Sequence, residues 1–362
     1  MTARVAIVGA GPIGCAAAAF LVRAGHAPAM WSPTGGRLHH KAGRTSIACT
    51  GALQGEVECE LLASPDRLAE FPVVLVCLPA NAYAAVLGPL NAHWRSGQHV
   101  VLSGALSLAP LWIAAAAAAA DVQVTGWATT LTTAHFQPDG LLHVNPLRGR
   151  IDMATVGATG SVSAQLQCEE LFGERFVAAD SLLAPALANI NPIAHAAEVI
   201  PNLTRMESGE AWSLFGHFTP VVGRLAEGLD HERRAVAQAF GLELPSLRQH
   251  YARSYHVPPG PLHAMAQEIV RRGMSPNGPA ALEHRYVLED APFGLAFLEA
   301  LGGVADVRTP VLTACLSLLG AAYARDFRAE NFLLDALDIS GTGVDALRAR
   351  CAAAASAASR AR

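Results

Sequence analysis

The first 181 residues alternate short apolar runs with segments of helical periodicity. The runs are rich in Val, Ile and Leu and contain almost no polar positions, which is typical of parallel strands covered on both faces. They lie at residues 4–8, 73–79, 99–106 and 122–127, and two further strands are expected in MATVGA (153–158) and RFVAAD (175–180). The pattern predicts an α/β domain over residues 1–181 with a doubly wound parallel sheet, that is, a Rossmann fold.

The alternation of apolar runs and helical segments ends near residue 182. Longer stretches with helical periodicity follow, such as HERRAVAQAFG (231–241) and VLTACLSLLGAAYARDF (311–327). We therefore predict a domain boundary near residue 181 and an all-helical C-terminal domain over residues 182–362.

The first apolar run leads directly into GAGPIG and then into a helical pattern, which is the context in which a GxGxxG motif binds a dinucleotide. Gly9 allows the tight turn, Gly11 lets the backbone approach a pyrophosphate, and Gly14 permits close packing of helix on strand. The helix N-terminus adds free N–H groups. We expect cofactor contacts from Gly9, Gly11, Pro12, Ile13 and Gly14; the alternative is a purely structural turn.

The end of the second strand, near Trp31, bears on which dinucleotide is bound. No acidic residue stands roughly 20 residues after the start of the motif, where one would hold the ribose 2′-hydroxyl of NAD. The loop instead carries Ser32, Thr34, Arg37, Lys41 and Arg44. Hydroxyl and guanidinium groups can donate to a 2′-phosphate, so Ser32 and Arg37 favour NADPH over NADH. The alternative is a solvated basic loop.

Ligands of open α/β sheets collect at the carboxyl ends of the strands. Leu78 and Pro79 follow one predicted strand, and Ser103 lies at the end of the next. These three residues, with the adjoining Ala80 and Gly104, are further candidate cofactor contacts, with a packing role as the alternative.

Charge and cysteine content limit which classes of partner and which cell compartment are expected. The net charge is −4 and there is no dense basic cluster, so small molecules are expected as partners and nucleic acid is not. The apolar segment 111–122 is shorter than the roughly 20 residues that span a bilayer, so no membrane is expected. The seven cysteines are scattered without a CxxC pair, which predicts neither disulfides nor a metal site. With no secretory signal at the start, we expect a cytoplasmic protein.

Two polar residues interrupt an apolar run in LANINPIAHAAEVIPN (187–202). Asn191 and His195 are four apart and share one face of a helix. Such a pair could present a general acid/base beside a neutral amide. The alternatives are a histidine satisfied in the core, and Asn191 acting as an N-cap before Pro192.

A second polar stretch, LEHRYVLEDAPFGL (282–295), offers a partner for this histidine. Pro292 and Gly294 predict the end of a helix and the beginning of a turn. A carboxylate at such a turn, Asp290, could accept the other ring N–H of His195 and fix its tautomer.

The three motifs GAGPIG, NINPIAH and HRYVLEDAPFGL together resemble the opine dehydrogenase family, which includes octopine and nopaline dehydrogenases. The resemblance implies a Rossmann domain followed by a helical domain. It also implies NAD(P)H-dependent reductive condensation of an amino acid with a 2-keto acid such as pyruvate. It further implies that His195 and Asp290 are the catalytic pair and that Asn191 is a neighbouring site residue.

The substrate side differs from the family pattern, because GWATTLTTAH (126–135) stands where an acidic residue and a Pro-aromatic pair are usual. Thr129, Thr130 and Thr132 could donate hydroxyls to a keto-acid carboxylate. A product with two carboxylates also requires an arginine. The candidates are Arg205, Arg253 and Arg285, and we take Arg285 as the working choice.

Two other functions remain open. A ketopantoate-type reductase would need a catalytic lysine in the second domain, and the only lysine, Lys41, lies in the first. A histidine-based hydroxyacid dehydrogenase or keto-acid reductase survives as the alternative enzyme. A non-enzymatic dinucleotide-binding sensor, with His195 in the core, is the alternative outside enzymes. A homodimer through the helical domain is also expected.

Overall fold

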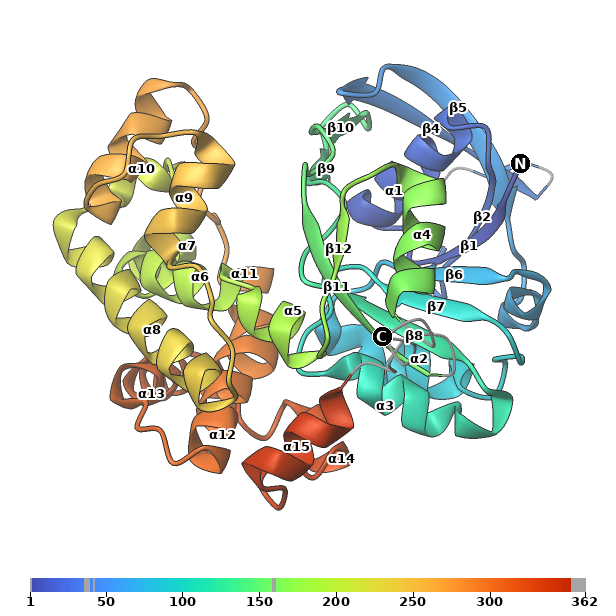
Figure 1. The fold of residues 1–362 in the computed structure, drawn as a ribbon. Helices are drawn as coiled ribbons and strands as arrows, with labels where there is room; N and C mark the ends of the chain where they lie inside the picture. The colour runs from blue at the N-terminus through green and yellow to red at the C-terminus, as the bar shows by residue number, and fades with distance from the viewer. Residues whose placement is uncertain (1, 36–39, 42, 158–160, 353–362) are drawn as a thin grey trace. The chain divides into compact units, whose positions relative to one another are not determined.

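The computed structural model describes residues 2–35, 40–41, 43–157 and 161–352, and it divides into two compact units (Figure 1). The first unit comprises Met1–Ala186 together with the segment that begins at Ala349, and the second is Leu187–Arg348. The division lies close to the boundary expected near residue 181, which remains a prediction. The return of the chain to the first unit at Ala349 is not indicated by the sequence pattern.

The first unit is built on a sheet whose central six strands are parallel. Their spatial order is β5 (Gly55–Leu61), β2 (Ala27–Trp31), β1 (Arg4–Val8), β6 (Val73–Val76), β7 (His99–Leu102) and β8 (Gln123–Trp127). In order along the chain this is 3-2-1-4-5-6, the arrangement of dinucleotide-binding sheets, whose ligands lie where the order reverses. The reversal falls between β1 and β6. The predicted Rossmann fold is confirmed.

Antiparallel pairs extend this sheet at both ends. On one side β11 (Ile151–Val156) runs antiparallel to β8, and β12 (Phe176–Ala178) lies parallel to β11. On the other side β4 (Arg44–Gly51) runs antiparallel to β5 and pairs with β3 (His40–Lys41) and β10 (Leu142–Val144), which pairs with β9 (Ala134–Phe136). The sheet is therefore mixed rather than wholly parallel.

Helices cover the sheet. α1 (Pro12–Arg23) packs closely because its residues Cys15–Ala19 are small and buried. Each large apolar core side chain, such as Ile7, Met30 or Leu75, contributes about 1.5–3 kcal/mol through burial. The other helices of this unit are η1 (Pro65–Glu70), η2 (Ala80–Ala82), α2 (Tyr83–Leu90), α3 (Ala109–Ala116), η3 (Ala118–Ala120), α4 (Ser161–Phe172) and α5 (Leu183–Ala188), which spans the division.

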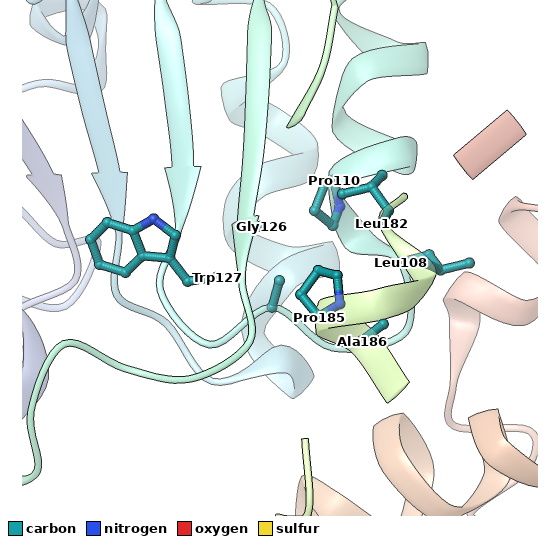
Figure 2. Close-up of a pocket in the computed structure, with 8 residues that line it drawn as sticks. Leu108, Pro110, Gly126, Trp127, Leu182, Pro185 and Ala186 are labelled. Carbon is teal, nitrogen blue, oxygen red and sulfur yellow. The ribbon is translucent and has the colours of Figure 1, made fainter. Parts of the chain in front are cut away.

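A small apolar cavity of about 10 Å³ lies in this unit beside the carboxyl end of β8 (Figure 2). Pro110 and Pro185 face it, and Gly126 and Trp127 of β8 form part of its wall. A space of this size holds at most about one water molecule and offers no room for a substrate. None of the candidate site residues lines it.

The second unit is helical, as the sequence predicted. Its helices are α6 (Asn191–Val199), η4 (Ile200–Asn202), α7 (Leu203–Glu207), η5 (Phe215–His217), α8 (Pro220–Ala239), α9 (Leu247–Tyr255), α10 (Leu262–Arg271), α11 (Arg285–Leu288), η6 (Ala291–Ala296), α12 (Phe297–Val304), α13 (Pro310–Tyr323), α14 (Phe332–Ala336) and α15 (Val344–Cys351), which spans the second division. Among the described residues, none of the helices is both long and apolar enough to cross a bilayer.

Buried charges on α8 hold the neighbouring helices. Asp230 pairs with Arg233 at 2.7 Å and also accepts the backbone N–H of Leu247, at the start of α9. Glu232 accepts the N–H groups of Val311 and Leu312 in the first turn of α13, both at 2.8 Å. Each carboxylate thus satisfies helix N–H groups that have no partner within their own helix.

The segment containing Pro292 and Gly294 differs from the predicted turn. Residues Ala291–Ala296 form a π-helix, η6, that continues into α12. A Cβ on Gly294 would lie 2.2 Å from Cγ of Pro192, so α6 and η6 cross at a distance that only glycine permits. The carbonyl of Pro292 is satisfied by Nδ2 of Asn331 at 2.9 Å. Pro292 and Gly294 lie inside a helical segment that packs closely on α6, and they do not begin a turn. The turn prediction is therefore wrong.

Candidate functional site

The glycine turn after β1 shows which glycines the fold itself needs. Gly9 has φ +114°, and a Cβ there would lie 2.5 Å from the carbonyl oxygen of Cys77. A Cβ on Gly14 would lie 2.1 Å from the carbonyl oxygen of Gly9. A Cβ on Gly11 would meet no atom within 4 Å and its φ is −79°. Packing therefore requires Gly9 and Gly14, whereas the space above Gly11 suits a bound group.

The first turn of α1 lacks an acceptor for its N–H groups. Gly11 is the N-cap, no side chain caps it, and the first turn has no acidic residue. Pro12 opens the helix, where its missing N–H costs nothing. The half-buried Ile13 and the buried Gly14 follow. The turn thus offers backbone donors and the positive end of a helix dipole to a phosphate, which fits a dinucleotide.

The end of β2 has the polar character expected from the sequence. Ser32 directly follows the strand, and its Oγ lies 3.5 Å from Oγ1 of Thr34. Arg44 is paired with Glu58 at 3.3 Å and is not free for a ligand. Arg37 lies outside the described residues. No carboxylate stands directly after Trp31 to bind a ribose diol.

The carboxyl ends of β6 and β7 carry the other candidate cofactor contacts. Leu78 is half-buried, with its Cδ2 3.2 Å from where a Cβ of Gly9 would lie, and Pro79 is exposed. Ser103 is buried beside the Cys77 thiol, whose pKa burial raises to about 12. Leu78 borders the glycine turn, while the environment of Ser103 also fits its packing alternative.

In the second unit, His195 of α6 and Asp290 come together although 95 residues separate them. Nδ1 of His195 lies 2.6 Å from Oδ2 of Asp290, whose side chain is only 2% exposed. Because a carboxylate only accepts, Nδ1 carries the proton and Nε2 presents a lone pair. Within the described residues Nε2 has no hydrogen-bond partner, and the side chain of His195 is 12% exposed. The pair has the geometry of an oriented general base.

Sequence reasoning missed the aromatic side chain that covers this histidine. The ring of Tyr286 stacks on that of His195 with centroids 3.4 Å apart and an interplanar angle of 11°. The ring of His284 meets Tyr286 edge-on at 4.5 Å. Burial, with the charges of His195 and Arg285, lowers the pKa of His284 to about 4. His284 is therefore neutral near pH 7. Both rings lie in the quoted HRYVLED motif, but nothing in the letters indicates stacking.

A buried carboxyl group on α6 was also missed. Glu198 follows Asn191 by seven positions and His195 by three, so all three share one face of α6. Its side chain is 3% exposed, and burial raises its pKa to about 8 against a hydrogen bond with Tyr251. Glu198 is thus mostly protonated at neutral pH. The i, i+4, i+7 spacing from Asn191 was the signal that could have found it.

Asn191 is the first residue of α6 and not its N-cap, which is Ile190. Its backbone N–H donates to Oδ1 of Asn189 at 3.0 Å. The alternative of Asn191 as a capping residue is therefore wrong. Its half-buried side chain stands on the His195 face, one turn before the imidazole.

Of the three candidate arginines, only Arg285 belongs to this cluster. It adjoins Tyr286 in α11, and the charges of Glu289 and Asp290 raise its pKa against the effect of burial. Its Nε and Nη2 bind Oε2 of Glu289 at 2.8 and 2.7 Å. Arg205 is paired with Glu210, and Arg253 is exposed in the last turn of α9. The remaining N–H groups of Arg285 are the best suited to a carboxylate.

The threonines after β8 are engaged to different degrees. The hydroxyl of Thr130 donates to the carbonyl of Thr132 at 2.8 Å, and that of Thr132 donates to the carbonyl of Asn145 at 2.6 Å. Thr132 is fully buried and serves the loop. Thr129 and Thr130 are half-buried beside Gly104, at the carboxyl end of β7. No cluster of His, Cys, Asp and Glu in the described part of the chain is arranged to hold a metal.

Comparison with known proteins identifies the family. The model of the α-helical domain of NAD/NADP octopine/nopaline dehydrogenases matches residues 178–323. An opine dehydrogenase of Arthrobacter sp. (strain 1C) is 31% identical over 353 residues, covering 95% of this chain and 97% of that protein. The chain belongs to the opine dehydrogenase family. It is therefore an NAD(P)-dependent oxidoreductase, and the resemblance of the three motifs is confirmed.

Solved structures agree on the fold of this opine dehydrogenase family member. An octopine dehydrogenase with NADH and L-arginine has a TM-score of 0.75 at 15% identity, covering 96% of this chain and 98% of that one. Yersinopine dehydrogenase with NADP⁺ has a TM-score of 0.70 at 17% identity, covering 96% and 97%. A 2-dehydropantoate 2-reductase from Methylococcus capsulatus reaches 0.58 at 17% identity, covering 89% and 97%. At these identities the likeness concerns the fold alone.

Proposed function

We propose that this chain joins the amino group of an amino acid to the carbonyl carbon of a 2-keto acid such as pyruvate. Loss of water gives an imine, and addition of a hydride and a proton gives a secondary amine between two carboxylates. The bound reduced nicotinamide supplies the hydride. The observation that supports this most is the 2.6 Å contact between His195 and Asp290 in a member of this family.

His195 is the general acid/base in this proposal. Its Nε2 accepts a proton from the ammonium group of the amino acid, which makes the amine nucleophilic. The same nitrogen returns that proton to the hydroxyl that leaves as water. Asp290 keeps the proton on Nδ1 and stabilises the imidazolium between these steps. Asn191, one turn earlier on the same face, orients the substrate through its amide.

The substrate carboxylates need cationic and hydroxyl donors. Arg285 carries the only guanidinium among the three candidates that lies beside Tyr286 and Asp290. We assign it to a substrate carboxylate. Thr129 and Thr130 are assigned to the carboxylate of the keto acid.

The dinucleotide is assigned to the glycine turn, with Gly9, Gly11, Pro12, Ile13 and Gly14 at the pyrophosphate and with Leu78, Pro79 and Ser103 at the strand ends. NADPH is the preferred cofactor and NADH the second, because Ser32 and Arg37 replace the acidic residue that NAD would need. The open space at Gly11 is the feature that best supports this assignment.

The test is consumption of reduced cofactor by the purified protein, with NADPH and NADH in parallel. Pyruvate and a pool of amino acids are supplied, and each component is then omitted. We expect consumption that requires both keto acid and amine, and faster consumption with NADPH. Consumption with the keto acid alone would favour the hydroxyacid dehydrogenase. Tight cofactor binding with no consumption in any mixture would favour the sensor.

Two further assignments belong to this proposal. Seven free cysteines, six of them buried, support a reducing compartment, and we propose the cytoplasm. A homodimer through the helical domain is also proposed, and sedimentation velocity at several concentrations would test it.

A further inference from the structure

We propose that Tyr286 is a positioning residue that fixes the plane of the His195 ring and stabilises its protonated form. This inference deepens the proposed function, since it rests on His195 as the acid/base. The two rings are nearly parallel, at 11°, and their centroids are 3.4 Å apart. Of the aromatic contacts in the described residues, this is the stacked one at the candidate site.

The hydrogen bond to Asp290 alone does not determine the orientation of the imidazole. It fixes the direction of Nδ1 but leaves the ring able to rotate about that contact. A face-to-face neighbour removes this freedom, because rotation would drive the ring edge into the Tyr286 ring. Asp290 and Tyr286 together leave one direction for Nε2. A general base must be held in this way to meet its proton at hydrogen-bond distance.

Tyr286 is itself held in place before any substrate binds. Its backbone N–H donates to Nδ1 of His284 at 3.4 Å, which caps α11. The His284 ring lies against it edge-on at an interplanar angle of 85°. α11 also packs on α6, the helix that carries His195. The stack is therefore part of the folded unit.

The charge effect of the stack follows from the π cloud of the phenol ring. A cation above an aromatic face is attracted by it, so Tyr286 favours the imidazolium over the neutral ring. Asp290 is the hydrogen-bond partner of His195. The other titratable groups on the helices that pack around His195 are neutral near pH 7 or paired with one another. They are the pair Arg285–Glu289 and neutral His284 beside α11, protonated Glu198 on α6, Tyr251 and Tyr255 on α9, and the pair Asp230–Arg233 on α8.

The experiment compares Tyr286→Leu with Tyr286→Phe and uses Tyr255→Leu as a matched control. Tyr255 lies in the neighbouring cluster, where its ring contacts those of Phe215 and Tyr251. With the aromatic face removed, we expect kcat to fall about tenfold and the acid limb of the kcat/KM profile to move down by roughly half a pH unit. Tyr286→Phe keeps the face and should remain within about twofold of wild type.

A second measurement does not depend on catalysis. NMR titration of ¹³C-labelled histidine, with the His195 signal assigned by its loss in His195→Gln, reports the ring directly. Tyr286→Leu should abolish the ring-current displacement of the His195 Hε1 signal and move its titration midpoint to lower pH. Neither effect requires the phenol hydroxyl, so Tyr286→Phe should preserve both. Failure of the condensation assay leaves this result intact and thereby separates the two proposals.

Two outcomes would overturn the inference. One is a folded Tyr286→Leu protein with an unchanged pH profile and unchanged His195 signals. The other is Tyr286→Phe as impaired as Tyr286→Leu, since the hydroxyl and not the ring would then matter. If Tyr286→Leu fails to fold, Tyr286→Met, which keeps an apolar side chain without an aromatic face, takes its place in the same comparison.

Discussion

The buried side chain of Glu198 makes the stability of the helical unit depend on pH. It stands one turn beyond His195 and is 3% exposed, and burial raises its pKa from 4.5 to about 8. A carboxyl group in such a place is kept because the protein folds with it protonated. Its ionisation is then coupled to the free energy of unfolding.

Replacing this group gives a prediction about stability. Between pH 4.5 and 8 the folded chain holds a proton on Glu198 that the unfolded chain has lost, so stability falls as pH rises through this window. Glu198→Gln has no carboxyl group at this position, so this contribution to the pH dependence of stability is absent. Between pH 5 and pH 9 we expect the free energy of unfolding of the variant to fall by about 4 kcal/mol less than that of wild type. Urea unfolding at the two pH values measures this, with Glu243→Gln, at an exposed carboxylate, as control. Parallel behaviour of Glu198→Gln and wild type would refute it.

The Asp290 side chain gives a prediction about turnover. Asp290→Asn keeps the shape of the carboxylate but can present an N–H to Nδ1 of His195, which favours the wrong tautomer. We expect kcat to fall at least about 100-fold, with cofactor affinity unchanged because the glycine turn lies in the other unit. Steady-state rates and cofactor titration measure both. Asp345→Asn, at a fully exposed carboxylate, is the control. Near-normal turnover of Asp290→Asn would remove Asp290 from the mechanism.

At the scale of elements, the sequence predicts those strands whose residues form a continuous apolar run. β1, β6, β7 and β8 are continuous apolar runs, and the pattern predicts each of them. β4 and β5 were missed, because they bury only alternate positions, such as Ile47 and Val57, and the other face of β5 is charged.

The site was predictable to a smaller extent. Asn191 and His195 share a face by spacing alone, but the partner of His195 lies 95 residues away, and family resemblance supplied it. The stack of Tyr286 depends on how α11 packs on α6, which no local pattern records. The local pattern also does not predict the π-helix η6, where Gly294 allows α6 to pass close by.

That crossing gives a prediction for Gly294. A methyl group there would lie 2.2 Å from Cγ of Pro192, so α6 and η6 must move apart. Gly294→Ala should lower stability by about 1–3 kcal/mol and also reduce turnover, because these segments carry His195 and Asp290. Gly303→Ala is the matched control in α12, where a Cβ meets nothing within 4 Å and alanine should stabilise by up to about 1 kcal/mol. Thermal melts and initial rates distinguish them; equal behaviour of the two variants would contradict the packing argument.

The glycine turn gives a prediction that separates fold from ligand. Gly14→Ala places a Cβ 2.1 Å from the carbonyl of Gly9 and should destabilise the first unit by about 1–3 kcal/mol. Gly11→Ala meets no protein atom and should melt like wild type, yet weaken NADPH binding at least about tenfold because the methyl occupies the approach of the pyrophosphate. Fluorescence titration and melting curves test both. Normal NADPH affinity in Gly11→Ala would place the pyrophosphate elsewhere.

At the scale of the whole molecule, the first unit is assembled from two separate parts of the chain. Ser181 forms a bridge with Ala352, and the backbone N–H of Leu182 donates to the carbonyl of Cys351 at 2.9 Å. The side chain of Cys351 is fully buried. The last described residues thus complete a unit whose strands were all supplied before residue 179.

A pair of truncations tests this completion. A chain that ends at Arg350 loses the buried Cys351 side chain and both contacts with residues 181 and 182, whereas a chain that ends at Ala352 keeps them. We expect the shorter chain to be less stable than the longer one by about 1–3 kcal/mol. It should also show a lower melting temperature in the presence of NADPH. Identical melting of the two truncations would show that this segment contributes nothing.

The same two-part construction bears on the order of events during synthesis. The residues that complete the first unit leave the ribosome about 170 positions after Leu182. At about 5–20 residues per second, this takes roughly 8–34 s, during which the whole helical unit emerges. The contacts of residues 351 and 352 with residues 181 and 182 can therefore form only after the chain of the helical unit has emerged. Slow codons after residue 186 would lengthen this interval.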